Sequence, residues 1–66
     1  MKNNIKIERA RHHFTQGDLA EKVGVSRQTI NSIETKKYIP SAVLALKIAK
    51  IFNMPFDSLF ELEDDD

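Results

Sequence analysis

The chain has 66 residues, the size of one small domain, which buries only about 60% of its unfolded surface on folding. It contains no cysteine, which excludes disulfides and thiolate metal sites. It has neither the ~20-residue apolar run of a membrane span nor the apolar segment of a signal peptide. We therefore expect a soluble cytoplasmic protein that does not enter a membrane.

The formal net charge of zero hides an uneven distribution of charge along the chain. Residues 1–56 carry ten Lys or Arg and four Asp or Glu, whereas residues 57–66 carry six acids and no base. A basic body with an acidic tail is typical of a protein that binds a polyanion. It also fits an ordinary solvated surface with a solubilising tail. We expect one domain over residues 1–62 and a short, frayed acidic tail at residues 63–66.

Helical periodicity and helix end signals recur along the chain, while strand signals are almost absent. A first helix is predicted over about residues 4–13. A second is predicted over about residues 16–22, after a capping-box pattern with Asp in place of the usual Glu: the Thr15 hydroxyl can accept from the third helical N–H, and Asp18 favours the positive end of the helix dipole. Gly24 supplies the left-handed conformation that ends this second helix.

Three further helices are predicted in the second half of the chain. Ser26 caps a helix over about residues 27–35, and Ser41 caps one over about residues 42–52, which ends at a left-handed Asn53. A short fifth helix covers about residues 56–60. The five helices would share one small core formed by Ile5, Phe14, Leu19, Ala20, Val23, Val25, Ile30, Ile33, Leu44, Ala45, Ile48, Ala49, Phe52, Phe56, Leu59 and Phe60.

The second and third helices, joined tightly through a glycine, form a helix-turn-helix unit. Ile30 and Ile33 face inward, which leaves an outer strip without acids, formed by Arg27, Gln28, Asn31 and Ser32. Arg fits the O6/N7 edge of guanine, and Gln or Asn fits the N6/N7 edge of adenine. Polar residues also cover helices that bind nothing. The basic loop at residues 36–38 and the positive charge of residues 1–56 favour nucleic acid.

The segment FTQGDLAEKVGVSRQTINSIETKKYIPS resembles the Cro/C1-type helix-turn-helix family, also called the xenobiotic-response-element family. The matching features are Thr-Gln, Leu-Ala, Val-Gly-Val-Ser and a final Ile-x-x-Ile-Glu. The resemblance covers nearly the whole chain. It implies a compact, all-α, five-helix domain of the lambda-repressor type that binds double-stranded DNA.

The resemblance also implies roles for individual residues. Base reading in the major groove falls to Arg27, Gln28 and Ser32, with Thr29 and Asn31 at the groove's edge. Phosphate contacts fall to Gln16, Ser26, Lys36, Lys37, Tyr38 and Ser41. Gln16 would also support the first residues of the third helix. Arg9 and Glu34 would form an ion pair that locks the first helix across the reading unit.

Two positions depart from the pattern of the family. Glu8 stands where the family has an aliphatic core residue, so we expect a slightly rotated first helix with Ile7 facing the core instead. Lys36 stands where glycine or asparagine commonly ends the third helix. Either Lys36 adopts a positive φ, at a cost on the order of 1 kcal/mol, or the helix ends differently.

Other kinds of chemistry find little support in the sequence. His12 and His13 are about 100° apart on a helix and do not easily bind one metal ion together. There is no Ser/His/Asp set, no glycine-rich phosphate loop and no core large enough to shelter a substrate. We therefore expect no enzyme activity, no cofactor and no metal.

Apolar residues outside the predicted core face suggest a partner surface, formed by Val43, Leu46, Phe56 and Leu62. Scattered surface apolars are the alternative. A two-fold dimer would place two reading helices about one DNA turn, ~34 Å, apart. The favoured function is a homodimeric transcriptional regulator, a repressor, that binds an inverted repeat. The alternative is an antitoxin or interaction module of the same fold that neutralises a partner protein, and such antitoxins also bind DNA.

Overall fold

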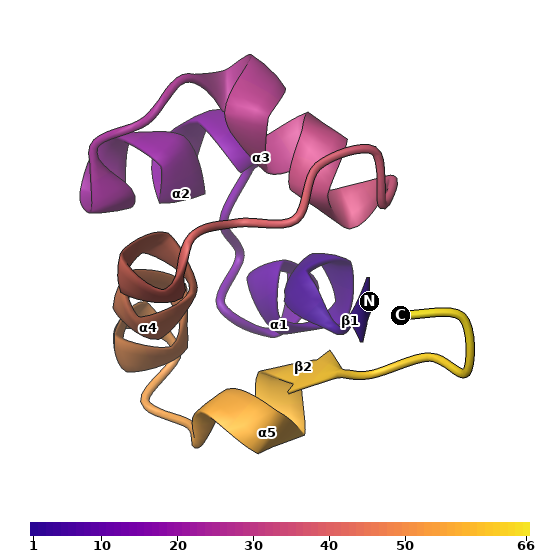
Figure 1. Cartoon of the computed structure of the whole chain (residues 1–66). Coiled ribbons are helices and arrows are strands. Elements are labelled where there is room, and N and C mark those ends of the chain that lie inside the picture. Colours follow the sequence, from indigo (N-terminus) through magenta and orange to yellow (C-terminus); the bar gives the residue numbers. More distant parts are fainter.

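The computed structural model describes residues 1–66 and contains five helices and one two-stranded sheet (Figure 1). The elements follow one another as β1 (Lys2–Asn3), α1 (Ile5–Arg11), α2 (Gln16–Val23), α3 (Arg27–Glu34), α4 (Ala42–Ile51), α5 (Phe56–Leu59) and β2 (Phe60–Glu61). The predicted all-α class is confirmed. In Figure 1, α1 lies between the α2–α3 pair and α5. The longest helix, α4, has 10 residues, too few to cross a bilayer.

The starts of α2, α3 and α4 follow the predicted hydroxyl caps. Thr15 Oγ1 accepts a hydrogen bond from the backbone N–H of Asp18 at 2.9 Å, and the Asp18 carboxylate accepts from the backbone N–H of Thr15 at 2.9 Å. Ser26 and Ser41 accept in the same way from the third backbone N–H of α3 and α4, at 3.1 and 3.2 Å. Each cap satisfies an N–H group that has no partner within its helix.

A left-handed residue follows each of the first four helices. As predicted, Gly24 and Asn53 take positive φ values, 80° after α2 and 53° after α4. His13 does the same after α1, with φ of 58°; the first helix, predicted to run through this position, therefore ends earlier, at Arg11. Each of these helices is therefore followed by a residue in the left-handed conformation, whether or not that residue is a glycine.

Lys36 adopts the strained conformation that was one of its two predicted alternatives. Helix α3 ends at Glu34, and Lys36 takes a φ of 65°. The Lys36 N–H donates to the carbonyl of Ile33 at 3.1 Å, and the Lys37 N–H donates to the carbonyl of Ser32 at 2.9 Å. These bonds satisfy carbonyl groups that the end of α3 leaves open, and so offset the strain.

The core contains thirteen buried apolar side chains: Ile5, Leu19, Ala20, Val23, Ile30, Ile33, Leu44, Ala45, Ile48, Ala49, Phe52, Leu59 and Phe60. Phe14 and Val25 are partly buried against it. The assignment of Phe56 to the core is wrong, because this side chain is 40% exposed. Helix α5 is one turn long and turns Leu59 inward, which leaves Phe56 at the rim against the ring of Phe60.

The predicted rotation of α1 is also wrong. Ile7 is 53% exposed, whereas Glu8 is only 8% exposed and lies beside Ile5 and Arg9 on the inner side of the helix. The pairing of Arg9 with α3, described below, fixes the rotation of α1 and so keeps Glu8 on the inner side. The Glu8 carboxylate keeps a partner at the edge of the core, the Arg11 guanidinium, at 3.0 Å.

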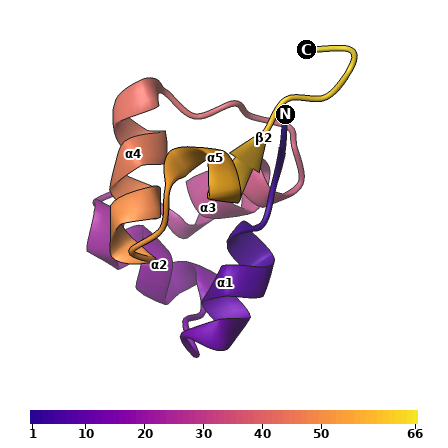
Figure 2. The ribbon, with the colours of Figure 1, turned by 90° about the horizontal axis from the view of Figure 1, so that it is seen from below.

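A short antiparallel pairing joins the two ends of the chain. Lys2 lies opposite Glu61 and Asn3 opposite Phe60. Phe60, predicted as the last residue of the fifth helix, instead begins β2 and packs into the core from there. Seen from below, β2 and the N-terminal segment run close together, with both chain ends on the same side of the domain (Figure 2).

Two residues of the acidic tail, Glu63 and Asp66, make specific contacts with the rest of the chain. The Lys36 ammonium contacts both carboxylate oxygens of Glu63, at 3.1 and 3.2 Å. The N-terminal ammonium of Met1 donates to Asp66 Oδ1 at 2.8 Å and lies 3.5 Å from Glu63 Oε1. The acidic tail is thus tied to the chain start and to the turn after α3.

Candidate nucleic-acid interface

The outer face of α3 presents the polar strip that the sequence predicts. Arg27, Gln28 and Asn31 are exposed, and Ser32 is partly exposed. On the opposite side, Ile30 and Ile33 are fully buried against α2 and the rest of the core. The hydroxyl caps of α2 and α3 fix where both helices begin, and therefore which residues of α3 form the strip. No carboxylate belongs to it.

Part of this strip lines a shallow polar hollow of about 350 Å³, whose walls are Ser26, Gln28, Thr29, Ser32 and Tyr38. The hydroxyl of Thr29 lies 2.9 Å from that of Ser26 at the cap of α3, so Thr29 shares its hydrogen bonding with the helix start. The hollow therefore joins expected base-reading residues to expected phosphate-binding residues. Its side chains offer mixed hydrogen-bond donors and acceptors, which suits the edge of a nucleic acid.

Arg27 lies apart from this hollow, next to the first turn of α2. A Cβ added to Gly17 would come within 4.0 Å of Arg27 Cδ. The stem of Arg27 therefore runs close to the backbone of α2, and its guanidinium makes no ion pair. An unpaired guanidinium at the start of α3 is free to bind an acceptor pair such as guanine O6 and N7.

Asn31 faces a second hollow, of about 450 Å³, on the other flank of α3. The same hollow is lined by Arg9, Gln16, Glu34 and five further residues near the chain start and the end of α3. The structure thus divides the five expected base-reading residues into separate groups. Gln28, Thr29 and Ser32 share one hollow, Arg27 lies against α2, and Asn31 belongs to the other flank.

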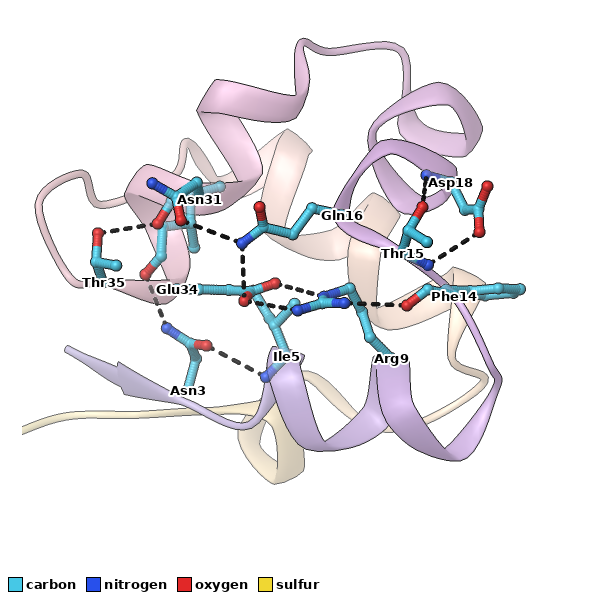
Figure 3. Close-up of polar contacts among 11 residues, drawn as sticks. Asn3, Ile5, Arg9, Phe14, Thr15, Gln16, Asp18, Asn31, Glu34 and Thr35 are labelled. Carbon is cyan, nitrogen blue, oxygen red and sulfur yellow. Dashed lines mark hydrogen bonds and ion pairs between the residues drawn. The ribbon is translucent and has the colours of Figure 1, made fainter.

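Four polar side chains form a continuous chain of contacts along this second flank (Figure 3). Arg9 Nε donates to Glu34 Oε2 at 2.7 Å, and Arg9 Nη2 donates to Glu34 Oε1 at 3.0 Å. Gln16 Nε2 donates to Glu34 Oε1 at 3.3 Å and to Asn31 Oδ1 at 3.2 Å. The hydrogen bond to Glu34 raises the pKa of Arg9, against the opposing effect of burial.

The contacts of Gln16 differ from the expected ones. The family resemblance implies support for the first residues of α3, but Gln16 contacts Asn31 and Glu34, in the middle and at the end of that helix. Glu34 determines these contacts, because Arg9 holds its carboxylate close to Gln16 and a carboxylate can only accept hydrogen bonds.

Comparison with known proteins agrees with the helix-turn-helix geometry of α2 and α3. A model of the helix-turn-helix family matches residues 5–59, which spans α1 through α5. The chain belongs to the Cro/C1-type helix-turn-helix family. Members of this family are DNA-binding regulators.

Three relatives are similar to this chain over almost their whole length. A protein of Methanocaldococcus jannaschii is 56% identical over 66 residues, all of both chains. The protein YgzD of Bacillus subtilis is 49% identical over 98% of both chains. A protein of Archaeoglobus fulgidus is 46% identical over 100% of this chain and 94% of its own. Each of the three is described as an uncharacterized HTH-type transcriptional regulator.

The expected phosphate-binding residues of this Cro/C1-type domain differ in whether their side chains already have a partner within the chain. Lys37 and Tyr38 are exposed just after α3, and their side chains make no hydrogen bond or ion pair within the chain. Lys36 is paired with Glu63, and the hydrogen bond from its ammonium is the main cause of the lowered pKa of Glu63. Ser41 caps α4 with its hydroxyl.

Sequence reasoning missed two residues that hold the interface. The Asn3 side-chain amide donates to the carbonyl of Ile33 at 3.0 Å and accepts from the backbone N–H of Ile5 at 3.2 Å, which ties the end of α3 to the start of α1 (Figure 3). Glu63 holds the turn after α3 through Lys36. No local pattern predicts the bonds from Asn3 to Ile33 and from Lys36 to Glu63, because the partners lie about thirty residues apart along the chain.

Proposed function

We propose that this protein is a sequence-specific transcriptional repressor that binds an inverted-repeat operator as a homodimer. In this proposal α3 enters the major groove, and the chain acts by binding and not as an enzyme. The observation that carries it is the outer face of α3, where Arg27, Gln28, Asn31 and Ser32 face solvent without an acid among them.

Base reading in this proposal belongs to Arg27, Gln28 and Ser32, with Thr29 and Asn31 at the edge of the groove. An unpaired arginine and an exposed glutamine at the start of the helix suit bidentate contacts with guanine and adenine. Phosphate contacts supply most of the affinity and its salt dependence. They come from residues around α3 and the start of α4: Gln16, Ser26, Lys36, Lys37, Tyr38 and Ser41.

The homodimer would form through apolar side chains that the fold leaves exposed. Val43 and Leu46 are 65% and 57% exposed on α4, three residues apart. Leu62 is 76% exposed and lines, with Phe56, a mainly apolar hollow of about 580 Å³ beside β2. Burying such residues in a two-fold contact removes apolar surface from water, and the symmetry matches that of an inverted repeat.

The test is selection of duplexes from a random library, followed by affinity measurements on the selected and on a scrambled duplex. We expect Arg27→Ala with Gln28→Ala to weaken binding to the selected duplex by about 30-fold or more, since each of the two bidentate contacts contributes about 1–3 kcal/mol. Binding to the scrambled duplex should change far less. Lys50→Ala, which removes an exposed cation from α4, is the control for the lost charge. Equal losses on both duplexes would refute base reading by α3.

A protein partner is the second candidate, because the same exposed apolar residues suit a heterologous interface. In that case the chain would act as an antitoxin that neutralises a partner protein. Sedimentation of the purified chain separates the two: a dimer that dissociates on Leu46→Glu supports the homodimer. A monomer that forms a stable complex with a co-expressed neighbouring gene product supports the antitoxin.

A further inference from the structure

The carboxylate of Glu34 accepts every hydrogen bond that it forms with Arg9 and Gln16. An ionised carboxylate accepts hydrogen bonds and cannot donate one. Arg9 grips both of its oxygens, and the third contact of Arg9, from Nη1 to the carbonyl of Phe14 at 3.0 Å, holds the guanidinium in turn. The Glu34 side chain is only 7% exposed. Its oxygens therefore stay in place whatever binds outside.

Gln16 must turn its amide nitrogen toward this carboxylate. That nitrogen carries two N–H groups, and they have two acceptors within reach, Glu34 Oε1 at 3.3 Å and Asn31 Oδ1 at 3.2 Å. A reversed amide would place oxygen against oxygen at Glu34. Gln16 therefore has no donor left for a phosphate, and the atom that it directs away from the network is its carbonyl oxygen (Figure 3).

The direction of Gln16 determines the direction of Asn31. Because Gln16 offers a nitrogen, Asn31 must offer its oxygen, so Asn31 Nδ2 points away from the network (Figure 3). Asn31 is exposed on the outer face of α3, and its outward group is a pure donor. A free asparagine would instead present a donor and an acceptor together, the pair that matches adenine.

We propose that Gln16 is a positioning residue that fixes the Asn31 amide, so that Asn31 recognises a hydrogen-bond acceptor on the DNA through Nδ2 alone. The acceptor is purine N7, guanine O6 or thymine O4 in the groove, or a phosphate oxygen at its edge. Asn31 then discriminates against the two-point contact with adenine. For Gln16 this positioning role replaces the phosphate contact that the family resemblance implies and that the proposed function includes, because both of its N–H groups have acceptors within the chain. The inference rests on the proposed insertion of α3 into the major groove.

A double-mutant cycle on the selected duplex tests the coupling. Gln16→Met keeps the length of the side chain and removes its donors, and Asn31→Ala removes the outward donor. We expect each single change to weaken binding by about 5- to 10-fold, the range for loss of one hydrogen bond. In the Asn31→Ala background, Gln16→Met should cost less than about twofold. Equal losses from Gln16→Met in both backgrounds would overturn the positioning role.

Asn31→Asp tests the direction of the amide. The aspartate still accepts from Gln16, so the fold is retained, but it replaces the outward donor by a negatively charged acceptor. We expect a loss of tenfold or more against the selected duplex, larger than that of Asn31→Ala. Binding as tight as that of the parent chain, or tighter, would overturn the proposal. Thermal unfolding of each variant separates a lost contact from a lost fold.

The source of the acceptor is identified with modified duplexes. If the acceptor is a base, a single 7-deazapurine or an exchanged base pair abolishes the effect of Asn31→Ala. If it is a phosphate, a single uncharged methylphosphonate does so. A methylphosphonate that abolishes the effect of Gln16→Met while that of Asn31→Ala persists would contradict the proposal. Arg27→Ala is run in parallel, because a retained loss there shows that α3 still reads DNA even where the Gln16 inference fails.

Discussion

The Arg9–Glu34 pair is the contact at the scale of single residues on which both the fold and the interface depend. Its two hydrogen bonds join α1 to the end of α3, and only 14% and 7% of the two side chains are exposed. Two-pronged arginine–carboxylate contacts of this kind are short and directional. The pair explains why α1 keeps Glu8 inside and why Gln16 faces Glu34.

Removal of Glu34 should therefore be costly. We expect Glu34→Ala to lower the free energy of unfolding by about 2–3 kcal/mol, because the guanidinium of Arg9 is left without its partner in a mostly buried place. Urea denaturation measures the change. Glu21→Ala, an exposed residue of α2, is the matched control and should change stability by less than about 0.5 kcal/mol. Similar values for both variants would show that the pair contributes little.

At the scale of elements, the helix starts are set by single hydroxyl groups. Ser41 illustrates this for α4, the longest helix, because its Oγ accepts from the backbone N–H of Leu44 at 3.2 Å. We expect Ser41→Ala to destabilise the protein by about 1 kcal/mol, the usual contribution of an N-cap. Ser58→Ala, at an exposed position of α5, is the control. A thermal melt in which both variants match the parent chain would rule out this role of the cap.

Helices could be predicted because their signals are local. Thr15, Ser26, Ser41 and Gly24 mark ends that depend on neighbours within four residues, and all four act as the spacing indicates. The β1–β2 pair could not be predicted from the sequence, because strands of two residues show no periodicity and the two strands lie at opposite ends of the chain. The direction of Gln16 was also beyond local reasoning. It depends on a carboxylate in α3 that is itself oriented by α1.

At the scale of the whole molecule, charges bring the two chain ends together. The N-terminal ammonium has a pKa raised above 8.0, chiefly by its hydrogen bond to Asp66. The pKa of Asp66 is lowered by that same bond, and the pKa of Glu63 is lowered by its hydrogen bond from Lys36. These groups form one cluster of two ammonium groups and two carboxylates at the edge of the β1–β2 sheet.

The cluster predicts a window of pH in which the tail adds stability. The lowered pKa values of Asp66 and Glu63 add stability at pH values above the ordinary pKa values of these groups, 3.8 and 4.5. This stability is lost as the pH falls through the lowered pKa values. The raised ammonium pKa adds stability below 8.0, which is lost as the pH rises through the raised value. Thermal melts of the chain and of a variant without residues 63–66 should differ most near neutral pH and converge at both extremes. A difference independent of pH would contradict this.

The contact between Lys36 and Glu63 also changes what DNA would encounter at the turn after α3. A phosphate that approaches this lysine meets an ammonium already neutralised from within the chain, by a carboxylate that behaves as a tethered counterion. A phosphate that takes over this ammonium must first displace Glu63, so Lys36 would add less affinity than an unpaired lysine at the same place, although the cation that the phosphate gives up would still contribute to the salt dependence. The acidic tail would thereby compete with DNA for this one cation of the basic surface.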